Sequence, residues 1–195
     1  MLVSGGGSNL QALLDASSAP DFPAQCVLVL SNVPTAFALT RAQQASIPTA
    51  VLPHGGYARR EDYDAALVEI LKAHQVELVC LAGFTRIITG TLLRAFPRGV
   101  LNIHPALLPA FPGMHGVRQA FLHGAKVAGC TVHFVDEGTD TGPILAQAAV
   151  PVLDTDTEET LAARILEQEH KLYPQALRTV AERRFTLEGR RVILT

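Results

Sequence analysis

Cysteine is scarce in this sequence, and basic residues are not concentrated anywhere along it. The three cysteines, Cys26, Cys80 and Cys130, each lie alone in an apolar segment with no C-x-x-C spacing. This pattern excludes a zinc or disulfide framework and favours buried, reduced thiols in a cytosolic protein. The 16 Lys and Arg residues against 18 Asp and Glu give a formal net charge of −2, without a basic stripe. Nucleic acid is therefore not an expected partner.

Long apolar runs are also absent. Met1 is followed almost at once by Ser4-Gly5-Gly6-Gly7, and no segment approaches the ~18 apolar residues that a membrane span requires. We therefore expect a soluble, cytoplasmic protein without a membrane partner. The seven histidines show no H-x-x-x-H or comparable ligand spacing, so we expect no bound metal.

Length and periodicity predict the fold class. A chain of 195 residues with 48% hydrophobic residues fits one domain spanning residues 1–195, since domains average roughly 150 residues. Apolar runs predict strands over 26–30, 78–82, 100–103 and 131–135. Helical periodicity predicts an amphipathic helix over 60–74. This alternation indicates an α/β, Rossmann-like fold with a mostly parallel twisted sheet and helices on both faces.

The last third of the chain carries two further signals. Asp156 followed by Glu159 resembles a capping box and predicts a helix that starts near Asp156, which Pro174 must kink, stop or restart. Glu188-Gly189 between two β-prone arms predicts a hairpin over 185–194 at the sheet edge.

A glycine-rich segment near the start predicts an anion site. Ser4-Gly5-Gly6-Gly7-Ser8-Asn9 separates a very short apolar strand from a helical stretch over 10–14. Glycines let several N–H groups and the helix N-terminus face one phosphate, and Ser8 and Asn9 can cap the helix or bond phosphate oxygens. A plain βα turn is the alternative. The spacing matches neither G-x-G-x-x-G nor a P-loop lysine.

Two more segments bring polar side chains to strand ends. In Asn102-Ile103-His104-Pro105, strand alternation puts Asn102 and His104 on one side, directly before a proline-rich loop at a position where open α/β sheets bind ligands. An amide beside an imidazole can stabilise an oxyanion and move a proton. Asp140, in the acidic loop after the strand 131–135, can pair with an imidazole and favour its protonated form. A capping Asn, a core His and an Asx-turn Asp are the alternatives.

Taken together, these segments resemble phosphoribosylglycinamide formyltransferases over nearly the whole chain, in order. The resemblance rests on the glycine loop, Ala82-Gly83-Phe84-Thr85-Arg86-Ile87, Asn102 to Pro109, the segment 132–143 and Gln168-Glu169-His170. It implies transfer of a formyl group from the co-substrate 10-formyltetrahydrofolate to the amine of glycinamide ribonucleotide, in purine biosynthesis, without a metal. The Asn102 amide and a protonated His104 would hold the oxyanion, and Asp140 would pair with His104 and help relay the amine proton.

The resemblance also implies two sets of binding residues. The nucleotide would contact the glycine loop with its phosphate and a later segment with its glycinamide end, through Gly7, Ser8, Asn9, Leu166, Glu167, Gln168 and Glu169. The folate would contact Arg60, Thr85, Arg86, Ile87, Ile88, Asn102, Asp136, Glu137, Gly138, Thr139 and Asp140. The N-terminal part would thus hold the phosphate, and the C-terminal part the folate and the catalytic loop. A monomer or a homodimer is expected.

The sequence departs from the family pattern at a few positions. The chain begins about four residues later than the pattern, Thr85 replaces a frequent Met, and Ala106 and Ala110 replace frequent Ser and Lys. Three other functions remain open: a formyltetrahydrofolate deformylase, a methionyl-tRNA formyltransferase and a non-catalytic nucleotide-binding module. The first two would need an additional domain, for which 195 residues leave little room. The third gives no reason for Asn102, His104 and Asp140 to occur together.

Overall fold

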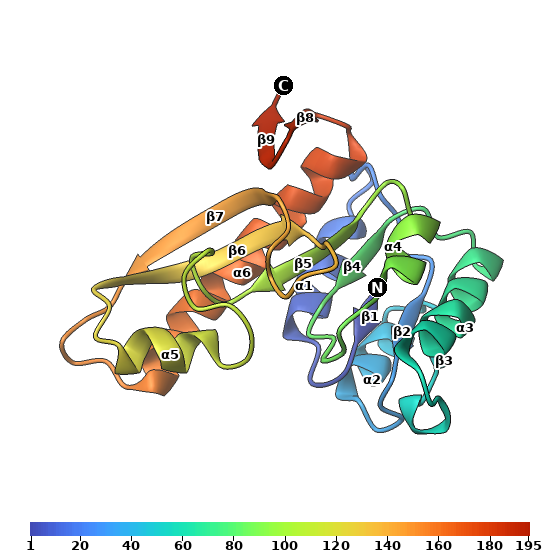
Figure 1. Cartoon of the computed structure of the whole chain (residues 1–195), viewed down its shortest axis with the longest axis horizontal. Coiled ribbons are helices and arrows are strands. Elements are labelled where there is room, and N and C mark those ends of the chain that lie inside the picture. The colour runs from blue at the N-terminus through green and yellow to red at the C-terminus, as the bar shows by residue number, and fades with distance from the viewer. The chain divides into compact units, whose positions relative to one another are not determined.

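The structure, a computed structural model, describes residues 1–195 and divides into two compact units, Met1–Leu101 and Asn102–Thr195. Strand β5 (Val100–His104) begins in the first unit and ends in the second. The seven strands of the main sheet follow the order β3-β2-β1-β4-β5-β6-β7 (Figure 1). The α/β fold with a mostly parallel sheet is therefore confirmed, while the assignment of residues 1–195 to one domain stays a prediction.

The first unit alternates short buried strands with helices. Its elements are β1 (Leu2–Val3), α1 (Ser8–Ser17), β2 (Val29–Ser31), α2 (Phe37–Gln44), β3 (Thr49–Val51), the 3-10 helix η1 (His54–Gly56), α3 (Arg60–Ala73), β4 (Val79–Leu81) and α4 (Gly90–Ala95). Strand β1 pairs in parallel with β2 and β4, and β2 pairs in parallel with β3. The predicted helix over 60–74 is confirmed, with Tyr63, Leu67 and Leu71 fully buried.

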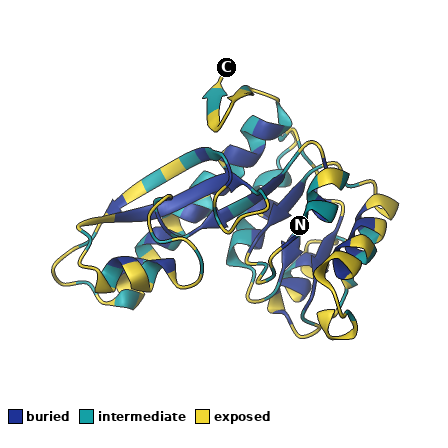
Figure 2. Cartoon of the chain, viewed as in Figure 1, coloured by how far each residue is buried: buried dark blue, intermediate teal, exposed yellow.

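The second unit is built on an antiparallel pair. Its elements after β5 are α5 (Gly116–Leu122), β6 (Val127–Phe134), β7 (Ile144–Pro151), α6 (Glu158–Ala181), β8 (Phe185–Glu188) and β9 (Arg191–Leu194). Strand β6 is buried along nearly its whole length, whereas β7 mixes buried, intermediate and exposed residues (Figure 2). Helix α6 packs on both strands. The strand order makes β6 an inner strand of the sheet and β7 its edge.

Two predicted strands differ from the observed ones at their boundaries. The strand predicted over 26–30 is β2, which begins only at Val29, although Cys26 and Leu28 are buried. The strand predicted over 131–135 is β6, which begins four residues earlier, at Val127. An apolar run reports burial rather than hydrogen bonding, so it includes Cys26, which is buried but lies outside β2. In β6, Val127 is paired but exposed, and the buried Ala128 and Gly129 belong to residue types that are depleted in strands.

The predicted capping box of α6 is wrong by one residue. Thr157 is the N-cap, its hydroxyl accepts from the Thr160 N–H at 3.3 Å, and the Thr160 hydroxyl accepts from the Thr157 N–H at 2.9 Å. Asp156 instead accepts two hydrogen bonds from Arg164, each 2.7 Å long. The helix also continues through Pro174 to Ala181, because Tyr173 and Leu177 bury its face there.

The pair of Asp156 and Arg164 should make α6 sensitive to acid. The hydrogen bonds from Arg164 hold the pKa of Asp156 far below its ordinary range, against the opposing effect of burial. A depressed carboxyl pKa contributes stability that is present above the unfolded value of about 4 and is lost as the pH falls. We expect Asp156→Asn to lower Tm at pH 7, and the difference from the wild type to narrow below about pH 4.

Thermal unfolding monitored by circular dichroism from pH 7 to pH 3 checks this expectation. Asp154→Asn is the matched control, because Asp154 pairs with Lys126 at 2.8 Å on the surface, where an ion pair contributes little. A Tm difference for Asp156→Asn that stays constant across the pH range would show that the charge is not the cause.

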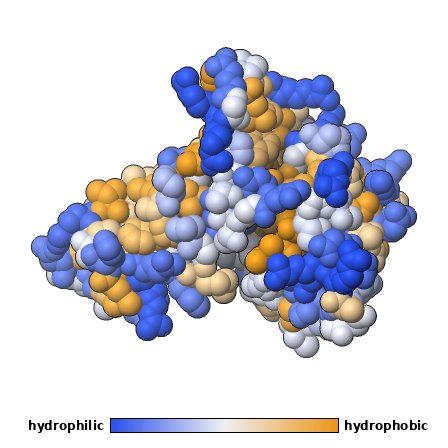
Figure 3. Space-filling view, in the orientation of Figure 1, coloured by the Kyte–Doolittle hydropathy of each residue, from blue (hydrophilic) through white to orange (hydrophobic).

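The C-terminal hairpin is confirmed. Strands β8 and β9 pair antiparallel around Gly189 and form a two-stranded sheet of their own. The ring of Phe185 packs on Phe134 of β6 with centroids 5.3 Å apart. Apolar side chains are also exposed in this unit, among them Leu122 and Val127, and Figure 3 shows apolar surface around α5 among hydrophilic residues.

The fold also bears on the cysteines and on membrane insertion. All three cysteines are buried and free, as predicted. Burial and the neighbouring charge of Glu169 raise the pKa of Cys130 to about 12, so this thiol remains protonated. None of the helices is both long enough and apolar enough to cross a membrane.

Candidate active site

The glycine-rich segment forms the start of α1. Gly7 is the N-cap in the left-handed conformation, with φ +74°, and its carbonyl accepts from the Gln11 N–H at 2.9 Å. Ser8 and Asn9 are the first residues of the helix, and no side chain caps it. Of their two expected roles, capping of α1 is therefore wrong, because Gly7 occupies the N-cap position. Their binding of phosphate oxygens stays a prediction.

A cavity of about 420 Å³ opens at this helix N-terminus. It is lined by Gly5, Gly6, Gly7, Ser8, Asn9, Phe37, Arg41, Ala82 and Gly83. Arg41 is the only charged residue among them, and the helix macrodipole adds partial positive charge at the same end. The cavity is thus suited to an anion, as the sequence predicts for a phosphate.

The three glycines of the loop are not equivalent. A Cβ atom on Gly7 would lie 2.6 Å from Ala38 Cβ and 2.9 Å from Ala38 Cα, whereas a Cβ on Gly5 or Gly6 would meet nothing within 4 Å. Gly7 therefore permits the close packing of α1 on α2. Gly6 borders open cavity, where an added side chain takes the place of a ligand.

We expect Gly6→Val to raise the KM for a phosphorylated substrate at least about tenfold, with the KM for the second substrate and the Tm nearly unchanged. Gly7→Val should instead lower the Tm, through strain at positive φ and overpacking against Ala38. Steady-state kinetics and thermal unfolding of both variants check this. Equal losses of both substrates in Gly6→Val would mean that the loop only supports the fold.

The residues predicted for folate in the first unit lie on α3 and in the loop before α4. Arg60 is the exposed first residue of α3. The Thr85 N–H donates to the Ser4 hydroxyl at 2.9 Å, and the Arg86 guanidinium lies 4.3 Å from the centre of the Tyr63 ring. Ile87 is half exposed and Ile88 is buried. The backbone N–H of Thr85 is thus already used within the protein.

The same loop is held at its far end by a buried carboxylate. Asp64 of α3 accepts from the Thr89 N–H at 2.6 Å and from the Thr89 hydroxyl at 2.8 Å. Burial raises the pKa of Asp64, although both hydrogen bonds oppose the shift. Residues 85–88 therefore lie between two fixed points, Ser4 and Asp64.

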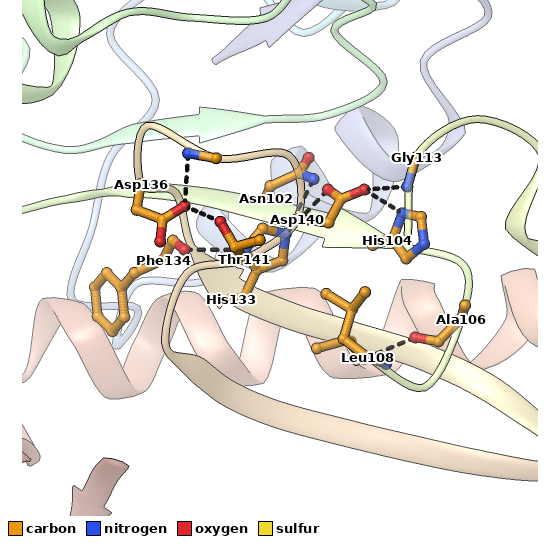
Figure 4. Close-up of polar contacts among 12 residues, drawn as sticks. Asn102, His104, Ala106, Leu108, Gly113, His133, Phe134, Asp136, Asp140 and Thr141 are labelled. Carbon is orange, nitrogen blue, oxygen red and sulfur yellow. Dashed lines mark hydrogen bonds and ion pairs between the residues drawn. The ribbon is translucent and has the colours of Figure 1, made fainter. Parts of the chain in front are cut away.

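In the second unit, four polar side chains meet at the ends of β5 and β6 (Figure 4). Asn102 and His104 come from β5, His133 comes from β6 and Asp140 comes from the loop after β6. His104 Nδ1 lies 3.4 Å from Asp140 Oδ2, and His133 Nε2 lies 3.6 Å from Asp140 Oδ1. The carboxylate thus lies between two imidazoles. The structure brings together the three residues that the sequence singles out for chemistry.

Asp140 is held in place by its backbone and by its neighbours. Its φ of +53° is left-handed, a conformation that Asp tolerates, and it accepts from the Gly113 N–H at 2.7 Å. Burial raises the pKa of Asp140, but the neighbouring His133 ring, the hydrogen bond from the Gly113 N–H and the charge of His104 outweigh it and hold the pKa below its ordinary value. At neutral pH the group is therefore a carboxylate, as well as a turn residue.

Both ring nitrogens of His104 face acceptors. Its Nε2–H donates to the Phe111 carbonyl at 2.8 Å, and Nδ1 faces Asp140. The ring is only 5% exposed. An imidazole with an acceptor at each nitrogen is best satisfied as the doubly protonated imidazolium.

His133 is the member of this cluster that sequence reasoning missed. Its Nδ1–H donates to the Phe134 carbonyl at 2.9 Å, so Nε2 can accept from the Asn102 amide at 3.3 Å. This contact leaves the second N–H of the Asn102 amide available. A buried histidine within a β-strand before an acidic loop was the available signal, but it does not differ from that of a core histidine.

The whole chain was compared with known proteins. Residues 1–177 match the formyl transferase family. The chain belongs to the formyl transferase family. Its relatives include the phosphoribosylglycinamide formyltransferase of Bacillus subtilis, 43% identical over 91% of each chain, and the trifunctional purine biosynthetic protein adenosine-3 of Drosophila melanogaster, 52% identical over 91% of this chain. A crystal structure of glycinamide ribonucleotide transformylase 1 from Symbiobacterium toebii is 52% identical, with a TM-score of 0.96 over 99% of this chain and 91% of that one.

These relatives differ greatly in length. The chain spans only 13% of the Drosophila protein, against 91% of the Bacillus protein. What it shares with the longer protein is thus the formyl transferase part.

In this formyl transferase, the predicted folate loop over 136–140 has a clear internal structure. Asp136 accepts from the Gly138 N–H at 3.1 Å and from the Thr141 hydroxyl at 2.6 Å, and the Arg190 guanidinium donates to the Thr141 carbonyl. A Cβ on Gly138 would lie 2.0 Å from Thr141 Oγ1. The exposed residues are Glu137, Gly138 and Thr139. Asp136 therefore shapes the loop, and the exposed residues can meet a ligand.

The segment predicted for the glycinamide end lies on α6 of the formyl transferase. Glu169 is buried, Glu167 is exposed, and Leu166 and Gln168 are half-buried. On a helix, residues two apart face different directions. Glu167 and Glu169 therefore cannot both face one ligand.

Proposed function

We propose that this formyl transferase moves a formyl group from 10-formyltetrahydrofolate to the primary amine of glycinamide ribonucleotide. The observation that carries the proposal is the cluster of Asn102, His104, His133 and Asp140, in which both imidazoles are buried, in a chain of this family. The names of its relatives support the choice of acceptor, since the Bacillus protein is called a phosphoribosylglycinamide formyltransferase.

In the proposed reaction, the amine nitrogen attacks the formyl carbon directly. A new C–N bond forms, the carbonyl oxygen becomes an oxyanion, and the bond from the formyl carbon to folate N10 then breaks. The amine loses one proton and N10 gains one, which gives formylglycinamide ribonucleotide and tetrahydrofolate. No covalent enzyme intermediate or metal ion is needed, because the amine is itself a nucleophile and the oxyanion can meet protein donors.

We assign the oxyanion donor role to Asn102, whose amide keeps one N–H beyond its contact with His133. His104 contributes its positive charge, because its two N–H groups already face Phe111 and Asp140. Asp140 maintains that charge and helps pass the amine proton to N10, through water. His133 orients the Asn102 amide. These groups would stabilise charge that develops only in the transition state.

We further propose which residues bind the two substrates. Gly7, Ser8 and Asn9 would hold the nucleotide phosphate. Leu166, Gln168 and Glu169 of α6 would supply the glycinamide contacts, with buried Glu169 nearest the amine, whereas the exposed Glu167 faces another direction. Folate contacts would come from Arg60, Thr85, Arg86, Ile87, Ile88, Asn102, Asp136, Glu137, Gly138, Thr139 and Asp140. The three buried, free cysteines favour a cytoplasmic location.

A folate absorbance assay tests this function. The purified chain is mixed with 10-formyltetrahydrofolate, and the release of tetrahydrofolate is monitored with and without glycinamide ribonucleotide. We expect release only when the nucleotide is present. Equal release without it would identify a deformylase, and no release in either mixture would identify a binding module; either result would contradict the proposal.

A further inference from the structure

The guanidinium of Arg41 is fixed against the glycine loop of the first unit. Its Nε–H donates to the Gly6 carbonyl at 2.8 Å, and Nη1 donates to Gln11 Oε1 at 3.3 Å. Its Cζ also lies 5.1 Å from the centre of the Phe37 ring. Three contacts thus hold a side chain that would otherwise be mobile, so much of its ordering entropy is lost on folding rather than on binding.

The charge of Arg41 has no carboxylate partner. Its contacts are a backbone carbonyl, an amide oxygen and an aromatic ring, and Nη2 has no acceptor within the protein. Asp15 is reached only through Gln11, whose amide donates to it at 2.8 Å. A fixed guanidinium without a counter-ion, at the wall of a cavity that no acidic residue lines, provides a charge for an anion to neutralise.

The bond to Gly6 has a second consequence. A carbonyl oxygen beside an anion site repels the anion, and the charged N–H of Arg41 offsets the negative end of this dipole. The loop N–H groups and the helix N-terminus then act on a ligand with less opposition. Arg41 therefore acts both through its own charge and through the loop.

We propose that Arg41 determines specificity for the phosphate, so that it distinguishes the phosphorylated substrate from its dephosphorylated nucleoside. This inference rests on the proposed function. The alternative is a purely structural contact between α2 and the loop. The two differ in their dependence on the phosphate: a specificity residue affects only substrates that carry it, whereas a structural contact affects all substrates alike.

The test measures kcat/KM for glycinamide ribonucleotide and for the corresponding riboside without phosphate. Arg41→Met should lower the value for the nucleotide roughly tenfold or more, the effect of losing a charge-assisted hydrogen bond, and change the value for the riboside and the KM for folate less than about twofold. Arg98→Met is the matched control, because Arg98 pairs with Glu77 on the surface of the same unit. Equal losses for nucleotide and riboside, or none, would overturn the inference.

A second measurement separates this inference from the proposed function. Inorganic phosphate is titrated calorimetrically into the wild type, Arg41→Met and Arg98→Met. We expect weaker phosphate binding only in Arg41→Met, whatever reaction the chain catalyses. Identical titrations of all three proteins, including no binding to any, would overturn the role of Arg41. Absence of formyl transfer by the wild type would contradict only the proposed function.

Discussion

Replacing either Asn102 or His104 by alanine is expected to lower kcat by roughly 100-fold or more, the effect of removing one group that stabilises an oxyanion. Asn102→Ala removes a donor, since the Asn102 amide N–H would meet the oxyanion. His104→Ala removes a positive charge and also leaves the Phe111 carbonyl without its donor at 2.8 Å. Steady-state kinetics at saturating concentrations of both substrates measure the two effects.

The effects of these two substitutions should not multiply. Both residues serve one transition state, so the double variant should retain more activity than the product of the single losses. Asn102→Leu removes the amide donor at similar side-chain volume, so it separates loss of the donor from loss of packing. The Tm of every variant reports whether its fold is destabilised. Near wild-type turnover in either single alanine variant would refute the assignment of that residue.

Asp140→Asn is expected to lower kcat by orders of magnitude while both KM values change little. The substitution keeps the shape of the side chain and an oxygen for the Gly113 N–H, but it removes the charge between His104 and His133. The pKa of Asp140 lies below its ordinary value, so the wild-type carboxylate is charged throughout the range in which the assay is run. The full charge is therefore lost at every assay pH.

The two roles of Asp140 predict opposite results. Asparagine tolerates the left-handed conformation as well as aspartate does, so the Asp140→Asn variant would keep full activity if the residue served only the turn. Asp154→Asn, which removes an exposed carboxylate in the same unit, controls for net charge. Retained turnover in Asp140→Asn would leave Asp140 with only a turn role.

Much of the fold was predictable because periodicity and glycine placement act locally. The helix over 60–74, the hairpin and the α/β class are set by spacing within short segments. Element boundaries were less predictable, since the N-cap of α6 depends on competition between Asp156 and Thr157 for the same helix start. The Asp156 carboxylate accepts two hydrogen bonds from Arg164, eight residues along the chain. A local sequence pattern does not show this contact.

The candidate site was predictable to a different extent. Asn102, His104 and Asp140 stand in recognisable motifs, and the structure brings their side chains together. His133 and Arg41 were missed, because their roles depend on contacts across 31 and 35 residues of sequence with Asn102 and Gly6. The sequence suggested that Gly7 is a glycine because of a ligand, whereas the structure shows a packing reason: a Cβ atom on Gly7 would overlap with Ala38.

The fate of the formyl carbon tests the central claim most directly. The enzyme is incubated with 10-formyltetrahydrofolate labelled with carbon-13 in the formyl group and with glycinamide ribonucleotide, and the labelled products are identified by NMR. Direct transfer predicts that the label appears as an amide on the glycinamide nitrogen, with one tetrahydrofolate released for each amide formed. Labelled free formate, or label retained entirely in the folate, would contradict it.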